Sequence, residues 1–180
     1  MASKTLHIND PMPAFPALPG VDGKKYSDKD FAGKKLVVVV FSCNHCPYVQ
    51  AYEDRMIALQ RDYETKGVQL IAINSNEIHN YPQDNFDEMV KRAKQKGFNF
   101  LYLRDDDQSI AEAFGATHTP EFFVFDQNRK LRYHGKMDDN WKDPTAVKES
   151  YLRDALEALL AGKEVKTPET FSIGCTIKWK

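Results

Sequence analysis

Two cysteines separated by two residues are the most chemically active feature of the sequence. Cys43 and Cys46 enclose Asn44 and His45, and this spacing lets both thiols close a disulfide ring on one tight helical turn. Such a pair exchanges disulfides when one thiolate attacks a partner disulfide and the second thiol resolves the mixed species. We interpret Cys43 as the attacking thiol, Cys46 as the resolving thiol, and His45 as a catalytic neighbour that adds charge or a hydrogen-bond donor.

The acidity of these thiols depends on where the neighbouring elements begin and end. The apolar run Leu36–Phe41 predicts a buried strand just before the pair, and Pro47 predicts the first turn of a helix just after it. Free N–H groups and the positive dipole end of that helix would stabilise a thiolate and lower its pKa. If Pro47 occupies the first helical position, Cys43 lies in the preceding turn, where this effect is weaker.

A cysteine pair of this spacing is also half of a zinc site, which needs a second pair of ligands. One other cysteine exists, Cys175, and the remaining histidines are scattered: His7, His79, His118 and His134. Metal binding through Cys43, Cys46 and His45, and inert core cysteines, are therefore the less favoured readings. We expect redox chemistry with no metal and no cofactor.

Composition narrows the function classes further. The 180 residues carry 25 Lys and Arg against 26 Asp and Glu, so the net charge of −1 argues against a nucleic-acid or membrane-surface binder. Three cysteines are too few for a disulfide scaffold. The longest apolar run has six residues, whereas a membrane span needs about 20, and no targeting segment is recognisable. We therefore expect a cytoplasmic protein.

Strand-like and helix-like segments alternate along the chain. Further strands are predicted at 68–73, 98–103, 121–125 and 130–133. Helices are predicted at 47–63, at 86–96, just before residue 115, and after Asp143-Pro144. Alternating strands and helices pair in parallel with right-handed crossovers, and the late hairpin adds antiparallel strands. The sequence thus predicts one α/β domain over residues 1–180, with a mixed central sheet flanked by helices on both faces. Residues 1–20 form a Pro-rich N-terminal extension and residues 163–180 a C-terminal tail.

A helix-opening cysteine pair after an apolar strand, with Thr119-Pro120 before a later hairpin strand, resembles the thioredoxin superfamily. Within it, segments 41–49, 133–140 and 173–179 are similar to a peroxiredoxin-like group of the redoxin branch, the AhpC/TSA type. The resemblance implies a thioredoxin-like fold and an oxidoreductase. It also implies a cis peptide bond before Pro120 and a Thr119 backbone that lies against the reactive disulfide and pairs with the substrate. Asn44 and Glu121 complete the expected substrate contacts.

The same resemblance implies a protein dithiol or disulfide partner, and peroxide is a second candidate substrate. The peroxiredoxin pattern Pro-x-x-x-Thr/Ser-x-x-Cys is absent, because the places counted back from Cys43 hold Leu36 and Val40. A weak peroxidase using Cys43, with Cys46 or Cys175 as resolving thiol, is therefore the alternative enzyme. A redox-regulated binding module is the alternative outside enzymes. Thioredoxins also bury an acid where this chain has Val37, so Glu121, Glu53 or water must take the proton of the second thiol.

Cys175 lies in a tail too apolar to be simply solvated. Phe171, Ile173, Ile177 and Trp179 need a surface to cover. One interpretation makes Cys175 a third redox thiol, docked near Cys43 or reaching a partner subunit. The other makes it a small residue in a docked tail. The first predicts that a Cys46→Ser protein still forms a disulfide through Cys175.

Overall fold

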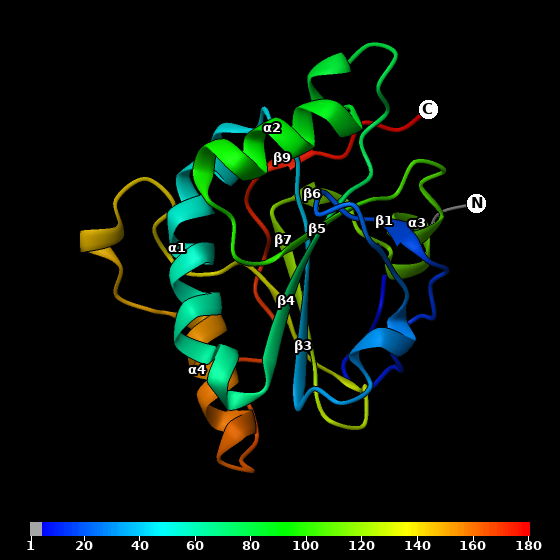
Figure 1. Cartoon of the computed structure of the whole chain (residues 1–180). Coiled ribbons are helices and arrows are strands. Elements are labelled where there is room, and N and C mark those ends of the chain that lie inside the picture. The colour runs from blue at the N-terminus through cyan, green and yellow to red at the C-terminus, as the bar shows by residue number, and fades with distance from the viewer. Residues whose placement is uncertain (1–4) are drawn as a thin grey trace.

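The computed structural model describes residues 5–180, so residues 1–4 of the N-terminal extension lie outside it (Figure 1). The strands are β1 (Leu18–Pro19), β2 (Lys25–Tyr26), β3 (Leu36–Phe41), β4 (Val68–Asn74), β5 (Leu101–Arg104), β6 (His118–Thr119), β7 (Glu121–Phe125), β8 (Leu131–Gly135) and β9 (Cys175–Thr176). The α-helices are α1 (Pro47–Tyr63), α2 (Phe86–Lys96), α3 (Ser109–Phe114) and α4 (Tyr151–Leu160). Short 3-10 turns are η1 (Asp28–Phe31), η2 (Glu64–Lys66), η3 (Pro82–Asp84) and η4 (Pro144–Ala146).

The central sheet is mixed and has the strand order β5-β4-β3-β7-β8. β3 pairs in parallel with β4 and β4 with β5, whereas β7 pairs antiparallel with both β3 and β8. β3 is the middle strand, and Val37, Val38, Val39 and Val40 have no exposed surface. An uninterrupted β-branched run fits this place because neighbouring layers cover both faces of the strand.

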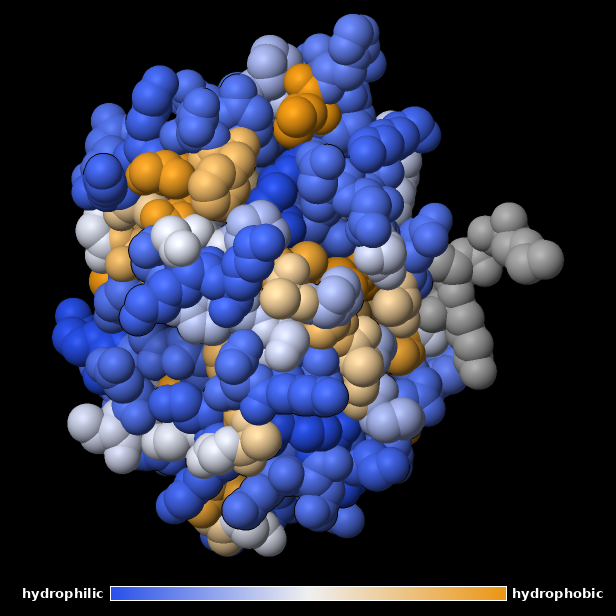
Figure 2. All heavy atoms as spheres, turned by 45° about the vertical axis from the view of Figure 1, so that its right-hand side comes forward, coloured by the Kyte–Doolittle hydropathy of each residue, from blue (hydrophilic) through white to orange (hydrophobic). Residues whose placement is uncertain are grey.

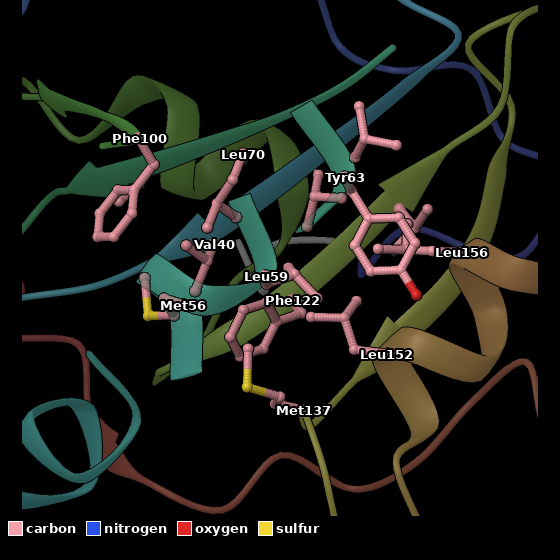
Figure 3. Close-up of a cluster of buried hydrophobic side chains, with 14 of the residues drawn as sticks. Val40, Met56, Leu59, Tyr63, Leu70, Phe100, Phe122, Met137, Leu152 and Leu156 are labelled. Atoms are coloured by element: carbon pink, nitrogen blue, oxygen red, sulfur yellow. The ribbon is translucent and has the colours of Figure 1, made fainter. Parts of the chain in front are cut away.

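Helices cover one face of this sheet with a large apolar core (Figure 3). Met56 and Leu59 of α1, Met89 of α2 and Leu156 of α4 pack with alternate side chains of the central strands. In Figure 1, α1 and α4 lie on the same side of β3 and β4. The helical spacing that predicted α1 and α2 is therefore the spacing of core contacts.

The opposite face is covered by α3 and by the N-terminal extension. Phe114 of α3 stacks edge-on against Phe41 and Phe123, and Phe15 and Leu18 of the extension join the same core cluster. Figure 2 shows a mostly hydrophilic surface on the side of the N-terminus, with hydrophobic atoms in small separate patches. Helices thus flank both faces of the mixed sheet, which confirms the predicted thioredoxin-like fold class.

Two predicted elements differ from the structure. β5 begins at Leu101 rather than at residue 98. The predicted helix after Asp143-Pro144 is wrong at its start: Asp143 caps only the turn η4, and α4 begins at Tyr151. Between η4 and α4 the backbone is not helical, because its polar groups bond to Asp139 instead. Asp139 N–H donates to the Glu149 carbonyl, and Asp139 Oδ1 accepts from Lys148 N–H.

The C-terminal tail returns across the sheet edge, passes the start of α1 at Cys175 and ends beside Glu77 and Gln108. β9 pairs antiparallel with β6 just before β7 (Figure 1). Ile177 is buried in the core beside α3, whereas Phe171, Ile173 and Trp179 stay exposed, so the expectation that all four apolar tail residues are covered holds only for Ile177. Within residues 5–180, no helix is both long and apolar enough to cross a bilayer.

Candidate active site

The cysteine pair lies at the carboxyl end of β3, where the chain turns into α1. Cys46 is the N-cap residue of α1 and Pro47 occupies its first turn, so Cys43 belongs to the preceding turn. The free N–H groups of α1 therefore begin beside Cys46 rather than beside Cys43. This is the arrangement in which the helix dipole favours a thiolate at Cys46.

Three sulfur atoms gather under β6. The Cys43 sulfur lies 3.6 Å from the Thr119 hydroxyl, and the Cys46 sulfur lies 3.4 Å from the Thr119 carbonyl oxygen. The Cys46 and Cys175 sulfurs are 2.7 Å apart, and all three cysteines are free thiols. Cys43 and Cys46 are buried, and Cys175 is partly exposed. The tail thus places Cys175 at the cysteine pair, in direct contact with Cys46.

The pKa values of the two cysteines are shifted in opposite directions. The hydrogen bond from the Cys43 thiol, with a smaller contribution from the Cys175 thiol, lowers the pKa of Cys46 to about 4 although burial opposes this. The bond to Cys46, burial, and the Asp84 carboxylate raise the pKa of Cys43 well above the usual value for a thiol. Burial and the neighbouring Cys46 raise the pKa of Cys175 to about 11. The lowered pKa favours a thiolate at Cys46, whereas the sequence interpretation expects the attacking thiolate at Cys43.

His45 is turned toward a buried carboxylate. Its Nδ1 lies 2.5 Å from Asp84 Oδ2, and its ring stacks on Tyr81. Asp84 has no exposed surface and also accepts the backbone N–H of Asn44 at 2.7 Å. Asp84 in η3 therefore fixes the turn between the two cysteines from a different part of the chain.

The Cys43 sulfur, a His45 ring nitrogen and an Asp84 oxygen all lie within 4.8 Å of one another, which is a possible metal-ligand set among the described residues. The carboxylate is already engaged, however. Besides the backbone N–H of Asn44, it accepts from the side-chain amides of Asn74 at 3.2 Å and Asn76 at 3.0 Å, whereas His45 Nδ1 lies close to it without hydrogen-bond geometry. A carboxylate saturated by donors holds the loop together, and we assign no metal to it.

Two expected substrate contacts are turned inward. The Asn44 side chain donates to the Gln83 carbonyl at 2.9 Å and accepts from the Tyr102 hydroxyl at 2.8 Å. Glu121 is 2% exposed, and it accepts from the His134 ring at 2.7 Å and from the backbone N–H of His118 at 3.0 Å. Both side chains are buried and hydrogen-bonded within the fold, and their contact with a substrate stays a prediction.

The remaining expected residues lie where the resemblance implied. The bond between Thr119 and Pro120 is cis, and the Thr119 backbone borders the pair.

Glu53, considered as a proton acceptor, forms a two-point ion pair with Arg92 of α2, with 3.0 Å between Oε2 and Nε.

Sequence reasoning missed Asp84. Its signal is the polar segment that follows β4, because the carboxyl ends of neighbouring parallel strands meet at one edge of the sheet.

Comparison with known proteins finds relatives that share the overall fold. A protein of Geobacillus kaustophilus described as an uncharacterized conserved protein is 39% identical, with a TM-score of 0.91 over 97% of this chain and 93% of that one. A hypothetical protein of Sinorhizobium meliloti is 35% identical, with a TM-score of 0.90 over 99% and 97%. A candidate thiol:disulfide interchange protein DsbE of Chlorobium tepidum is 25% identical, with a TM-score of 0.63 over 72% and 85%. No curated relative matches the sequence significantly.

The family profile named Redoxin matches residues 7–155, which include the whole central sheet and the cysteine pair. The matched part covers most of the chain, and the thioredoxin-like arrangement of sheet and helices extends over nearly the full length of the two relatives above 30% identity. The chain therefore belongs to the redoxin family of thioredoxin-like oxidoreductases.

Proposed function

We propose that the protein is a thiol-disulfide oxidoreductase that works through Cys43 and Cys46. The observation that carries the proposal is the position of the cysteine pair at the start of α1 and against Thr119, where the pKa of Cys46 is lowered to about 4. A thiol of ordinary pKa is mostly protonated at neutral pH and attacks disulfides slowly, whereas a stabilised thiolate is ready to react. The 25% identity to a candidate thiol:disulfide interchange protein supports this reaction class.

The exchange proceeds in two balanced steps. One thiolate of the pair attacks a sulfur of the substrate disulfide, forms a mixed disulfide and releases the first substrate thiolate. The second cysteine then attacks the mixed disulfide, closes the Cys43–Cys46 disulfide and releases the second substrate thiolate. The substrate gains two electrons, and an external dithiol must return them to the pair. In the cytoplasm, the compartment expected from the sequence, reducing systems supply such dithiols.

Reduction of insulin disulfides with dithiothreitol as electron donor tests this function. We expect the wild-type protein to accelerate the reaction over dithiothreitol alone, and the Cys43→Ser and Cys46→Ser proteins each to lose that acceleration. A Ser42→Ala protein is the matched control, because Ser42 is a buried neighbour without a thiol. Acceleration that survives both cysteine substitutions would contradict the proposal.

A slow thiol peroxidase is the second candidate, and the Thr119 hydroxyl at 3.6 Å from the Cys43 sulfur favours it. A hydroxyl at the sulfur would orient a peroxide, whose one oxygen oxidises the Cys43 thiol to a sulfenic acid while the other leaves as water with the thiol proton. A second thiol then forms a disulfide and releases a second water. Hydrogen peroxide consumption that depends on Cys43 and Thr119, without insulin reduction, would favour this reaction.

A further inference from the structure

Cys46 is the sulfur that both other thiols contact. It shares a hydrogen bond with Cys43, and it lies 2.7 Å from the Cys175 sulfur. In disulfide exchange the attacking, central and leaving sulfurs must lie side by side, because one S–S bond forms while the other breaks. When Cys43 and Cys46 are joined in a disulfide, Cys175 is therefore the thiol in position to attack Cys46 and release Cys43.

The three thiols differ in their access to solvent. Cys43 is 2% and Cys46 0% exposed, whereas Cys175 is partly exposed. An external thiol reduces a disulfide only by reaching one of its two sulfurs. A reductant that approaches the cysteine pair while β9 is paired with β6 therefore meets the Cys175 sulfur first.

A disulfide between Cys46 and Cys175 would combine an accessible sulfur with a good leaving group. Exchange is faster when the sulfur that leaves is stable as a thiolate. Attack on Cys175 expels Cys46, and the hydrogen bond from Cys43 lowers the pKa of Cys46 to about 4 at the start of α1. Moving the disulfide from Cys43–Cys46 to Cys46–Cys175 thus makes it easier to reduce from outside.

Lys178 adds a positive charge near Cys175. Its ammonium donates to the hydroxyl of Thr176, the next residue after Cys175, at 3.2 Å. Burial and the neighbouring Cys46 raise the pKa of Cys175, and the charge of Lys178 opposes them. The same charge attracts a thiolate that approaches the Cys175 sulfur.

We propose that Cys175 is the catalytic thiol through which the oxidised cysteine pair is reduced again, and that the external dithiol attacks the Cys175 sulfur. This inference rests on the proposed disulfide exchange and adds the route by which the electrons return. The Cys43–Cys46 disulfide is first passed on to Cys46 and Cys175, and this transfer brings one oxidised sulfur within reach of the reductant.

Each step of this route is balanced. The Cys175 thiol attacks Cys46 within the Cys43–Cys46 disulfide, Cys43 leaves, and the proton of Cys175 passes to Cys43. One thiolate of the external dithiol then attacks Cys175, forms a mixed disulfide and releases the Cys46 thiolate. The second thiol of the dithiol attacks its partner sulfur in that mixed disulfide, closes the disulfide of the reductant and releases Cys175 as a thiol. Two electrons have entered the protein, and all three cysteines are reduced.

A monothiol identifies the sulfur that the reductant attacks. One molecule of 2-mercaptoethanol cannot close a disulfide ring on itself, so its first adduct with the oxidised wild-type protein can be trapped by rapid addition of acid. Digestion at low pH, where thiolates are protonated and exchange stops, followed by peptide mass mapping locates this adduct. We expect it on Cys175. An adduct on Cys43 or Cys46 would overturn the proposal.

Separate rates for the two half-reactions test the route independently. Oxidised protein is mixed with dithiothreitol to measure re-reduction, and reduced protein is mixed with insulin to measure oxidation by a substrate. In the Cys175→Ser protein we expect re-reduction to be about tenfold slower than in wild type. Oxidation by insulin should stay within about twofold, because Ser keeps a hydroxyl beside Cys46. Ser172→Ala in the same tail is the matched control, since the Ser172 hydroxyl has no hydrogen-bond partner among the described residues, and both of its rates should equal those of wild type.

The outcomes separate this inference from the function beneath it. Equal re-reduction of the wild-type and Cys175→Ser proteins, or equal slowing of both half-reactions, would overturn the role of Cys175 while insulin reduction still depends on Cys43 and Cys46. Insulin reduction that survives substitution of both Cys43 and Cys46 would overturn disulfide exchange itself. The position of the mercaptoethanol adduct on wild type decides the question even if Cys175→Ser does not fold.

Discussion

The Cys43 thiol acts on its neighbour as a hydrogen-bond donor, and this role can be separated from its sulfur chemistry. Cys43→Ala removes the donor, so the pKa of Cys46 should rise from about 4 toward the ordinary thiol value near 9. Cys43→Ser keeps a hydroxyl donor, so the pKa of Cys46 should stay low. The ultraviolet absorbance of the thiolate, followed against pH, measures both. In wild type the absorbance should persist above about pH 4 and disappear as the pH falls through that value.

If the pKa of Cys46 stays low in both the Ala and the Ser protein, the helix start and the Cys175 thiol, rather than a donor at position 43, make Cys46 acidic. The result also bears on what the sequence could foretell. Spacing identified Cys43 and Cys46, and Pro47 indicated which of them the helix would favour. The sequence could not indicate that Asp84 raises the pKa of Cys43, because that effect depends on where η3 places a carboxylate 41 positions further along the chain.

The orientation of α1 against α2 depends on a buried ion pair. The Glu53 side chain is 2% exposed and meets Arg92, whose side chain is 23% exposed. Arg92→Ala would leave the carboxylate buried without its partner, so we expect the free energy of unfolding to fall by about 3 kcal/mol. Urea unfolding measures this. Lys91→Ala in the same helix is the control, because its pair with Glu88 is exposed and should be worth less than about 1 kcal/mol. Similar losses in both variants would mean that α2 is held by other contacts.

Helices and strands were predictable from the sequence where no contact with a distant residue opposed the local signal. β3 has the predicted bounds because its six apolar residues lie between polar turns, and α1 begins at the predicted Pro47. α4 was misplaced because Asp143-Pro144 carries a local start signal, whereas the hydrogen bonds of Asp139 with Lys148 and Glu149 hold this segment outside a helix. That pairing spans about ten residues and leaves no pattern in the sequence.

The path of the tail is a property of the complete molecule. Its composition predicted a docked segment, and Ile177 does enter the core. The place where Cys175 docks could not be predicted, because it is made by β6, the start of α1 and the loop after β4, which only the folded sheet brings together. The sequence allowed Cys175 to approach either cysteine, and the structure sets it against Cys46. The sequence-based expectation of a Cys175 disulfide in the Cys46→Ser protein stays a prediction, and contact with Cys46 makes the reciprocal variant the more direct test.

Closing a Cys46–Cys175 disulfide would join the start of α1 to the tail. In Cys43→Ser protein treated with diamide, these two thiols should lose two electrons and two protons to the oxidant and form that bond. It would link positions 129 apart, which should stabilise the fold by about 2–4 kcal/mol and raise Tm by roughly 4–16 °C. Calorimetry with and without a reductant measures the shift, and peptide mass mapping identifies the bond. The Cys43→Ser/Cys175→Ser protein should show neither. A cross-linked peptide without a rise in Tm would mean that the bond forms only after β9 has left β6. A bond made while β9 is paired with β6 constrains the unfolded chain without straining the folded one.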